Sequence, residues 1–99
     1  MVGIDIAKRI FQIHGVDKNG NTVLKKKLMR EQILTFMANL PKCLVGTEAC
    51  GGASWAREIT KLDHTVKLMA PQFVKPYVKT NKNDQADAEA ICEAVADQI

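Results

Sequence analysis

Four acidic residues stand out because their types and positions would together allow them to bind metal ions. Asp5 is the only charged residue among the first seven, within an alternating, β-branched segment typical of a strand. A carboxylate inside a central strand is costly to bury unless something pairs with it. Glu48 ends a second apolar segment, and Asp84 and Asp87 lie three residues apart where a helix is expected to begin, so both project from one helix face.

Convergence of these acids would create a catalytic metal site. Several carboxylates within a few ångströms repel one another unless cations lie between them, and Mg²⁺ prefers oxygen ligands. A pair of Mg²⁺ (or Mn²⁺) ions activates a nucleophilic oxygen and stabilises the leaving one in phosphoryl transfer. We therefore expect Asp5, Glu48, Asp84 and Asp87 to be both the metal ligands and the catalytic residues.

Three of the four acids also have a simpler structural explanation, whereas Asp5 does not. Asp84 with Asp87 is typical of a helix N-cap followed by an acid in the first turn, and Glu48 could pair with a lysine. Ser54 is the only serine, yet no His or Lys is arranged to activate it as a nucleophile. Trp55 is more typical of a core residue than of a base-stacking platform.

The predicted elements would bring the acids together at one edge of a sheet. Strands are expected at 2–7, 10–16, 22–28, 43–49 and 65–70, and helices at 31–40, 53–62 and 84–99. We expect Gly51 and Gly52 to break the chain after the fourth strand, and 71–83 to be a connector. The order β-β-β-α-β-α-β-α predicts an α/β fold with a mixed five-stranded sheet flanked by helices, with ligands bound at the carboxyl ends of its central strands.

The charge distribution predicts a polyanionic partner. The net charge is +3, but residues 84–99 carry five acids and no Lys or Arg, so residues 1–83 carry +8. The connector contributes Lys75, Lys79 and Lys82, interleaved with aromatic residues, and could follow a phosphate backbone or simply be solvated. We expect these three lysines, with Lys8, to contact nucleic acid.

Length and composition exclude several other classes. A chain of 99 residues fits one domain, and the sequence has no apolar run of the ~20 residues that a membrane helix needs. The first residues do not form a secretion signal, and an odd count of three cysteines without a CxxC motif favours reduced thiols in the cytoplasm. Because the last predicted helix reaches Ile99 without a stop signal, we expect residues 1–99 to be the N-terminal part of a longer protein.

Three segments resemble a known family. Gly3–Lys8 (GIDIAK), Glu48–Gly51 (EACG) and Lys82–Ala88 (KNDQADA) resemble the N-terminal DEDD domain of insertion-sequence transposases, a family that includes Piv-type invertases and bridge-RNA-guided recombinases. The resemblance covers essentially the whole chain. It implies a RuvC-like fold of the ribonuclease H superfamily, with Asp5, Glu48, Asp84 and Asp87 as a metal-binding acidic tetrad.

The resemblance also implies partners and a division of labour. It implies DNA and a guide RNA as partners, and a homo-oligomer for the full-length protein. Family members carry a nucleophilic serine in a C-terminal domain that these 99 residues do not include, and Ser54 does not match its context. The chain would therefore supply half of a composite active site of a DNA transposase or recombinase.

Two alternatives to this metal-dependent enzyme remain open from the sequence. The first is a non-catalytic nucleic-acid-binding module of a mobile-element protein, in which the acids only cap and pair. The second is a fragment of an actin-like ATPase, which also begins with a Gly-Ile-Asp strand. The second is disfavoured because Ala7, Lys8 and Arg9 occupy the place of the expected phosphate loop.

Overall fold

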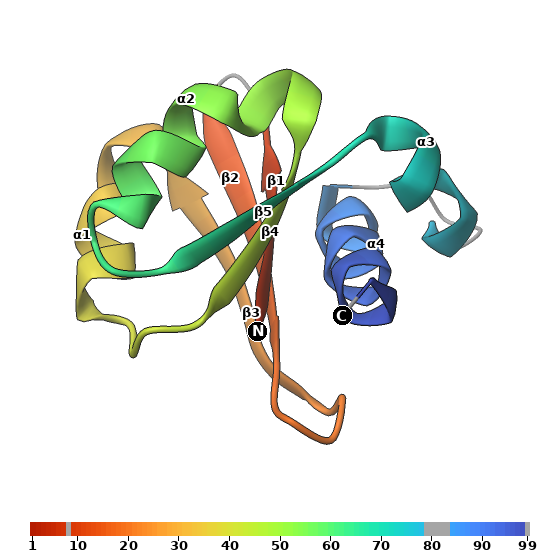
Figure 1. Ribbon diagram of the computed structural model, residues 1–99. Helices are drawn as coiled ribbons and strands as arrows, with labels where there is room; N and C mark the ends of the chain where they lie inside the picture. Colours follow the sequence, from red (N-terminus) through yellow and green to blue (C-terminus); the bar gives the residue numbers. More distant parts are fainter. Residues whose placement is uncertain (8, 79–83, 99) are drawn as a thin grey trace.

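The protein forms a mixed sheet enclosed between two helical layers (Figure 1). A computed structural model describes residues 1–7, 9–78 and 84–98, with the backbone alone described for Cys50 and for 84–86. The elements are β1 (Val2–Ile6), β2 (Ile10–Val16), β3 (Thr22–Met29), the 3₁₀ turn η1 (Arg30–Gln32), α1 (Ile33–Asn39), β4 (Leu44–Glu48), α2 (Ala49–Thr60), β5 (Thr65–Met69), α3 (Pro71–Val74), the 3₁₀ turn η2 (Lys75–Tyr77) and α4 (Asp84–Asp97).

The sheet has the strand order β3-β2-β1-β4-β5. β1 pairs antiparallel with β2, which pairs antiparallel with β3, whereas β4 is parallel to both β1 and β5. The β2–β3 hairpin closes through the Asp17 carboxylate, which accepts the backbone N–H groups of Asn19 and Asn21 at 2.9 and 3.0 Å. Gly20 adopts a φ of 82° there, which a glycine tolerates without strain. The predicted mixed five-stranded sheet is confirmed.

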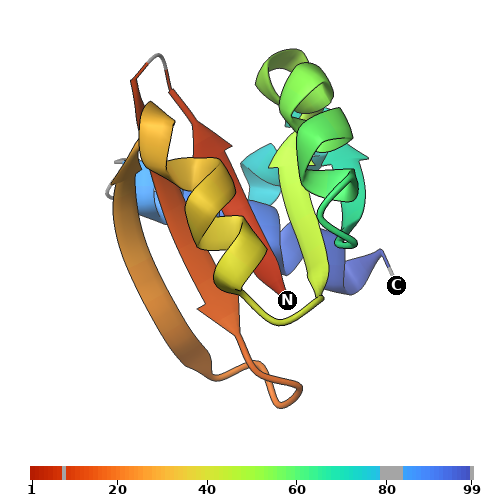
Figure 2. The same cartoon turned by 90° about the vertical axis from the view of Figure 1, so that its left-hand side faces the viewer.

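One face of the sheet packs against α1 and α2 (Figure 2). Phe11 and Trp55 meet edge to face, with ring centroids 5.0 Å apart, an arrangement that aromatic pairs favour. Trp55 is therefore a core residue, as its pattern indicated. The buried members of this core are Val2, Ile4, Phe11, Ile13, Leu28, Ile33, Met37, Val45 and Ile59.

Helix α4 covers the opposite face, and two glycines let it approach closely. A Cβ atom at Gly3 would lie 2.5 Å from the Ala88 carbonyl oxygen and 2.8 Å from the Cys92 backbone nitrogen, closer than real Cβ atoms come. At Gly46 a Cβ would overlap the Val95 side chain. Ala90, Ile91, Ala94 and Val95, on the side of α4 that faces the sheet, are all fully buried.

The structure corrects the predicted boundary at Gly51 and Gly52. We expected β4 to extend over 43–49 and the next helix to begin at Ala53, but β4 ends at Glu48 and α2 begins at Ala49. The two glycines lie inside the helix rather than breaking it. At Gly52 a Cβ atom would lie 2.5 Å from Thr47 Cγ2. A glycine at this position therefore allows the start of α2 to pack closely against β4, which a larger residue would prevent.

Three further boundaries differ. The 71–83 connector contains the short helix α3, with Pro71 in its first turn, followed by η2. The helix predicted at 31–40 is a 3₁₀ turn followed by α1, and α4 ends at Asp97. No helix among the described residues is long and apolar enough to cross a membrane.

The two neighbouring glycines of α2 allow a matched test of this packing. Gly52→Ala is expected to destabilise the protein by about 1–3 kcal/mol through overpacking against Thr47, lowering Tm by roughly 5 °C or more. Gly51→Ala is expected to be neutral or to stabilise by up to ~1 kcal/mol, because its Cβ would meet nothing closer than 3.7 Å and alanine favours helix. Thermal unfolding followed by circular dichroism measures both; equal effects of the two changes would contradict this account.

Candidate functional site

Two of the predicted acids lie at the carboxyl ends of adjacent parallel strands. Asp5 is the fourth residue of β1 and Glu48 the last of β4, and both are half-buried. Side chains alternate along a strand, so Asp5 shares the α4 face with Gly3, and Glu48 shares it with Gly46. The pairing of Gly3 with Gly46 and of Ile4 with Thr47, continued by one residue, brings Asp5 beside Glu48.

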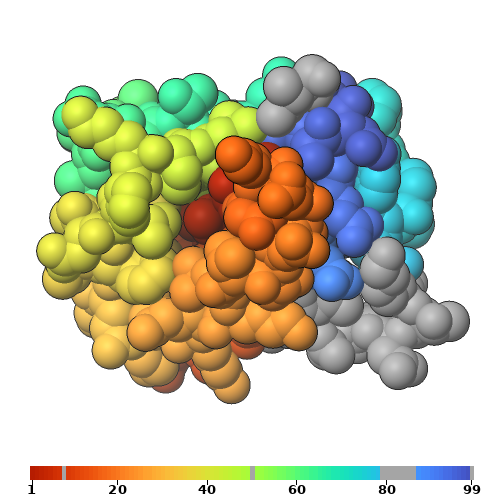
Figure 3. Space-filling view, turned by 90° about the horizontal axis from the view of Figure 1, so that it is seen from below, coloured from red at the N-terminus to blue at the C-terminus, as the bar shows by residue number. Residues whose placement is uncertain are grey.

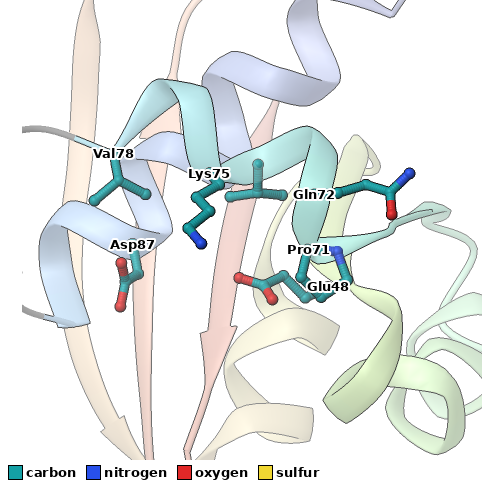
Figure 4. A pocket seen from close by; sticks show the side chains of 7 residues that line it. Glu48, Pro71, Gln72, Lys75, Val78 and Asp87 are labelled. Atoms are coloured by element: carbon teal, nitrogen blue, oxygen red, sulfur yellow. The ribbon is translucent and has the colours of Figure 1, made fainter.

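A pocket of about 660 Å³ brings the third acid to the same place (Figure 4). Glu48 enters it from the end of β4 and Asp87 from the first turns of α4, 39 positions later in the sequence. The remaining walls come from α3 and the segment after it. The lining residues are Glu48, Pro71, Gln72, Val74, Lys75, Val78 and Asp87.

The two carboxylates of the pocket interact electrostatically. Burial raises the pKa of Glu48 above its usual value, and the negative charge of Asp87 raises it further. Both effects penalise the ionised form of Glu48. A cation between the two groups would relieve this repulsion.

Lys75 is the cationic residue of this pocket. It lies on η2, is exposed to solvent, and directs its ammonium group toward the gap between Glu48 and Asp87 (Figure 4). The sequence predicted it as a nucleic-acid contact. Its position at the pocket mouth would let it approach a phosphate group that enters the pocket.

The full acidic tetrad lies only partly within the described residues. Asp5 is not among the residues that line the pocket, and the Asp84 side chain lies outside the described part, as do Lys8, Lys79 and Lys82. Among the described side chains, no group of three or more His, Cys, Asp or Glu lies close enough to hold a metal ion. The tetrad therefore stays a prediction.

Sequence reasoning missed how α4 is attached to the pocket wall. The Tyr77 hydroxyl donates to the Asp97 carboxylate at 2.5 Å, which joins η2 to the end of α4 and raises the pKa of the Tyr77 hydroxyl. Met69 and Val74 extend the α4 core beneath the same wall. Tyr77 is one of the aromatic residues of the 71–83 connector, and the residues around it in the sequence give no signal of a partner 20 positions away.

The buried histidines and cysteines lie outside the pocket. His64 holds α1 against β4: its Nε2 is 2.7 Å from the Met37 carbonyl oxygen, and its Nδ1 accepts the Cys43 N–H at 3.2 Å. His14 is also buried, which lowers its pKa. Burial raises the pKa of the Cys92 thiol to about 11, so it is an unreactive core residue.

The chain is similar to transposases of insertion sequences. It is 56% identical over 96 residues to a Pseudomonas aeruginosa protein named "Probable family 20 transposase", and 53% identical over 97 residues to the transposase for IS1328 of Yersinia enterocolitica. It is 43% identical to the transposase for IS1111A of Coxiella burnetii. These matches cover 96–97% of the chain but only 27–29% of the relatives.

The chain thus spans little more than a quarter of the length of the curated relatives it matches. No family model matches it. These relatives are named as transposases, two of them of insertion sequences, and this supports the predicted resemblance at the level of that class.

The raised pKa of Glu48 predicts a pH-dependent gain in stability on substitution. In the unfolded chain Glu48 ionises near pH 4.5, whereas in the folded protein its raised pKa delays ionisation to higher pH. As pH rises between these two pKa values, the free energy of unfolding therefore decreases. Glu48→Gln removes this loss, and solvent screening of a half-exposed group keeps the gain small, at about 2–4 °C in Tm at neutral pH. At pH 4 the two proteins should melt together.

Glu58→Gln, on the exposed side of α2, makes the same chemical change outside the pocket and serves as the control. Thermal melts between pH 4 and 8 measure the difference. The repulsion between Glu48 and Asp87 would be contradicted if Glu48→Gln lowered the Tm at pH 7.5, and lowered it by more than Glu58→Gln does.

Proposed function

We propose that the chain is the metal-binding part of a DNA transposase active site, built on a ribonuclease H-like, RuvC-like domain. The observation that carries this proposal is the meeting of Glu48 and Asp87, two acids far apart in sequence, in one pocket beside the end of β1 that carries Asp5. The similarity to insertion-sequence transposases supports DNA as the substrate.

The fold supports this proposal through its topology. Three antiparallel strands followed by two parallel crossover strands, in the order β3-β2-β1-β4-β5, form the arrangement that the RuvC-like resemblance implies. In open sheets of this kind, ligands bind beyond the carboxyl ends of the strands, near the point where the strand order reverses. Here β1 is that point: the strands that follow it in the sequence, β2 and β3, lie on one side of it in the sheet, and β4 and β5 lie on the other side.

The donor set fits a hard divalent cation. Asp5, Glu48, Asp84 and Asp87 offer only carboxylate oxygens, which suit Mg²⁺ or Mn²⁺ rather than zinc. Such an ion, when bound, would polarise a phosphodiester and lower the pKa of an attacking hydroxyl. Glu48 and Asp87, which line the pocket from β4 and α4, would hold such an ion, and Asp5 and Asp84 are the two further ligands that we propose.

Lys75 would position the substrate. Its ammonium group, at the mouth of the pocket, can bind a non-bridging phosphate oxygen and so hold the scissile phosphate over the acids. The nucleophilic serine that the resemblance implies lies in a C-terminal domain, and Ser54 is exposed on α2, outside the pocket lining. A guide RNA and a homo-oligomer remain predictions for the full-length protein.

Divalent-metal titration tests the proposal. We expect the 99-residue chain to bind Mn²⁺, and both Glu48→Gln and Asp87→Asn to weaken binding at least about tenfold, because each removes a charged oxygen ligand. Isothermal titration calorimetry measures this, with Glu58→Gln as the control variant. Identical isotherms for all four proteins would contradict the proposal and favour a binding module without metal chemistry.

A further inference from the structure

A line of cations along the outer edge of the sheet is not explained by the candidate site. It consists of Arg9, Lys25, Lys26, Lys27 and Arg30, which we call the β3 basic strip, and every member is exposed. Residues 9–31 carry six cations and two acids, so this stretch holds more positive charge than the net +3 of the whole chain. Among the described residues, neither ion pair of the protein involves a member of the strip.

The strip follows an edge strand. β3 pairs with β2 on one side only, so its other edge is open. Figure 3 shows the hairpin and β3, in orange, at the surface between the yellow atoms of α1 and the blue atoms of α4. From Lys25 to Met29 the strand spans about 14 Å at ~3.4 Å per residue. That distance corresponds to about four base-pair steps along the axis of a B-form duplex, which rises ~3.4 Å per step.

Aromatic rings hold two of these cations on the α1 side. The Lys26 ammonium lies 5.5 Å from the centroid of the Phe36 ring, and the Arg30 guanidinium lies 5.6 Å from that of Trp55. Cation–π contacts of this length restrict long side chains that would otherwise move freely in solvent. The ordering cost of binding a phosphate through Lys26 or Arg30 is correspondingly smaller.

The strip reaches the sheet edge that carries the acids. The backbone N–H of Arg30 donates to the Arg9 carbonyl oxygen at 2.9 Å, and the two residues line a surface hollow with Met29 and Glu31. This hollow lies where β1 and β3 end, the same edge of the sheet at which β4 ends in Glu48. On the α4 face, Glu89 and Glu93 act electrostatically on His14, the residue paired with Lys25, and so border the strip with negative charge.

We infer that the β3 basic strip binds the phosphodiester backbone of a nucleic-acid duplex and leads it along the outer edge of β3 toward the pocket of Glu48 and Asp87. The acids of α4 repel phosphate, so the duplex lies over the β3 edge and the Arg9–Arg30 hollow rather than across α4. This inference rests on the proposed function for the direction of the path, while binding by the strip itself does not depend on the metal site.

Lysines on an edge strand also have a protective role, because they prevent pairing with strands of other molecules. That role would leave affinity for nucleic acid independent of Arg9 and Lys27. Backbone binding instead predicts that each cation in contact with phosphate contributes about 0.9 to the slope of log affinity against log salt concentration.

The test uses the double variant Arg9→Gln/Lys27→Gln, which leaves the aromatic contacts of Lys26 and Arg30 intact. The control, Lys42→Gln/Lys61→Gln, removes two exposed lysines that pair with Asp63 and Glu58 away from the strip. Fluorescence anisotropy with a 20-base-pair DNA duplex and with an RNA duplex of the same sequence, between 50 and 200 mM NaCl, gives the slopes.

We expect the Arg9→Gln/Lys27→Gln slope to be shallower by about 2 and the affinity at 50 mM NaCl to fall at least about tenfold, with the control close to the unsubstituted chain. The duplex that shows this change identifies whether the strip takes DNA, RNA or both. Equal slopes for the two double variants, or no binding of either duplex by the unsubstituted chain, would overturn the inference.

The outcome is separable from that of the proposed function. If Mn²⁺ binding depends on Glu48 and Asp87 but the salt slope of Arg9→Gln/Lys27→Gln is unchanged, the inference about the β3 basic strip is contradicted and the proposed metal site is supported. If that slope becomes shallower but Mn²⁺ does not bind, the inference about the strip is supported and the proposed metal site is contradicted.

Discussion

The close approach of α4 to the sheet is the constraint on which the candidate site depends. The helix rests on β1 and β4 where Gly3 and Gly46 leave no side chain, and larger residues there would push it outward. Because α4 carries Asp87 in its first turns and β4 ends in Glu48, the separation of helix and sheet sets the separation of the two carboxylates. Packing of the sheet glycines against Ala88, Cys92 and Val95 thus controls the electrostatics at the start of α4.

This arrangement keeps an unfavourable interaction in the native state. Glu48 is half-buried beside a like charge, and its raised pKa shows that the folded chain holds it against the preference for solvent. Such a cost is typical of ligand sites, where the binding partner supplies the missing charge. The same molecule carries most of the cations of the β3 basic strip along the outer edge of β3, at the opposite side of the sheet from β5.

The sequence predicted the sheet and the residues at its carboxyl edge, because alternation, turn residues and helical spacing are local signals. The alternating pattern around Asp5 predicted a strand, and the structure places Asp5 there on the same face as Gly3. The boundary at Gly51 was wrong, since only the tertiary contact of Gly52 with Thr47 explains a glycine inside α2. The pocket wall from α3 and the Tyr77–Asp97 bond could not be predicted, because long-range contacts leave no local pattern.

The proposed function requires a divalent cation between the carboxylates that α4 and β4 bring together. The most direct measurement is an anomalous difference map from a crystal of the 99-residue chain grown with Mn²⁺, collected near the manganese absorption edge. The account predicts a peak within ~2.5 Å of carboxylate oxygens of both Glu48 and Asp87. Ordered side chains of Glu48 and Asp87 with no peak between them, while manganese occupies other positions in the crystal, would contradict it.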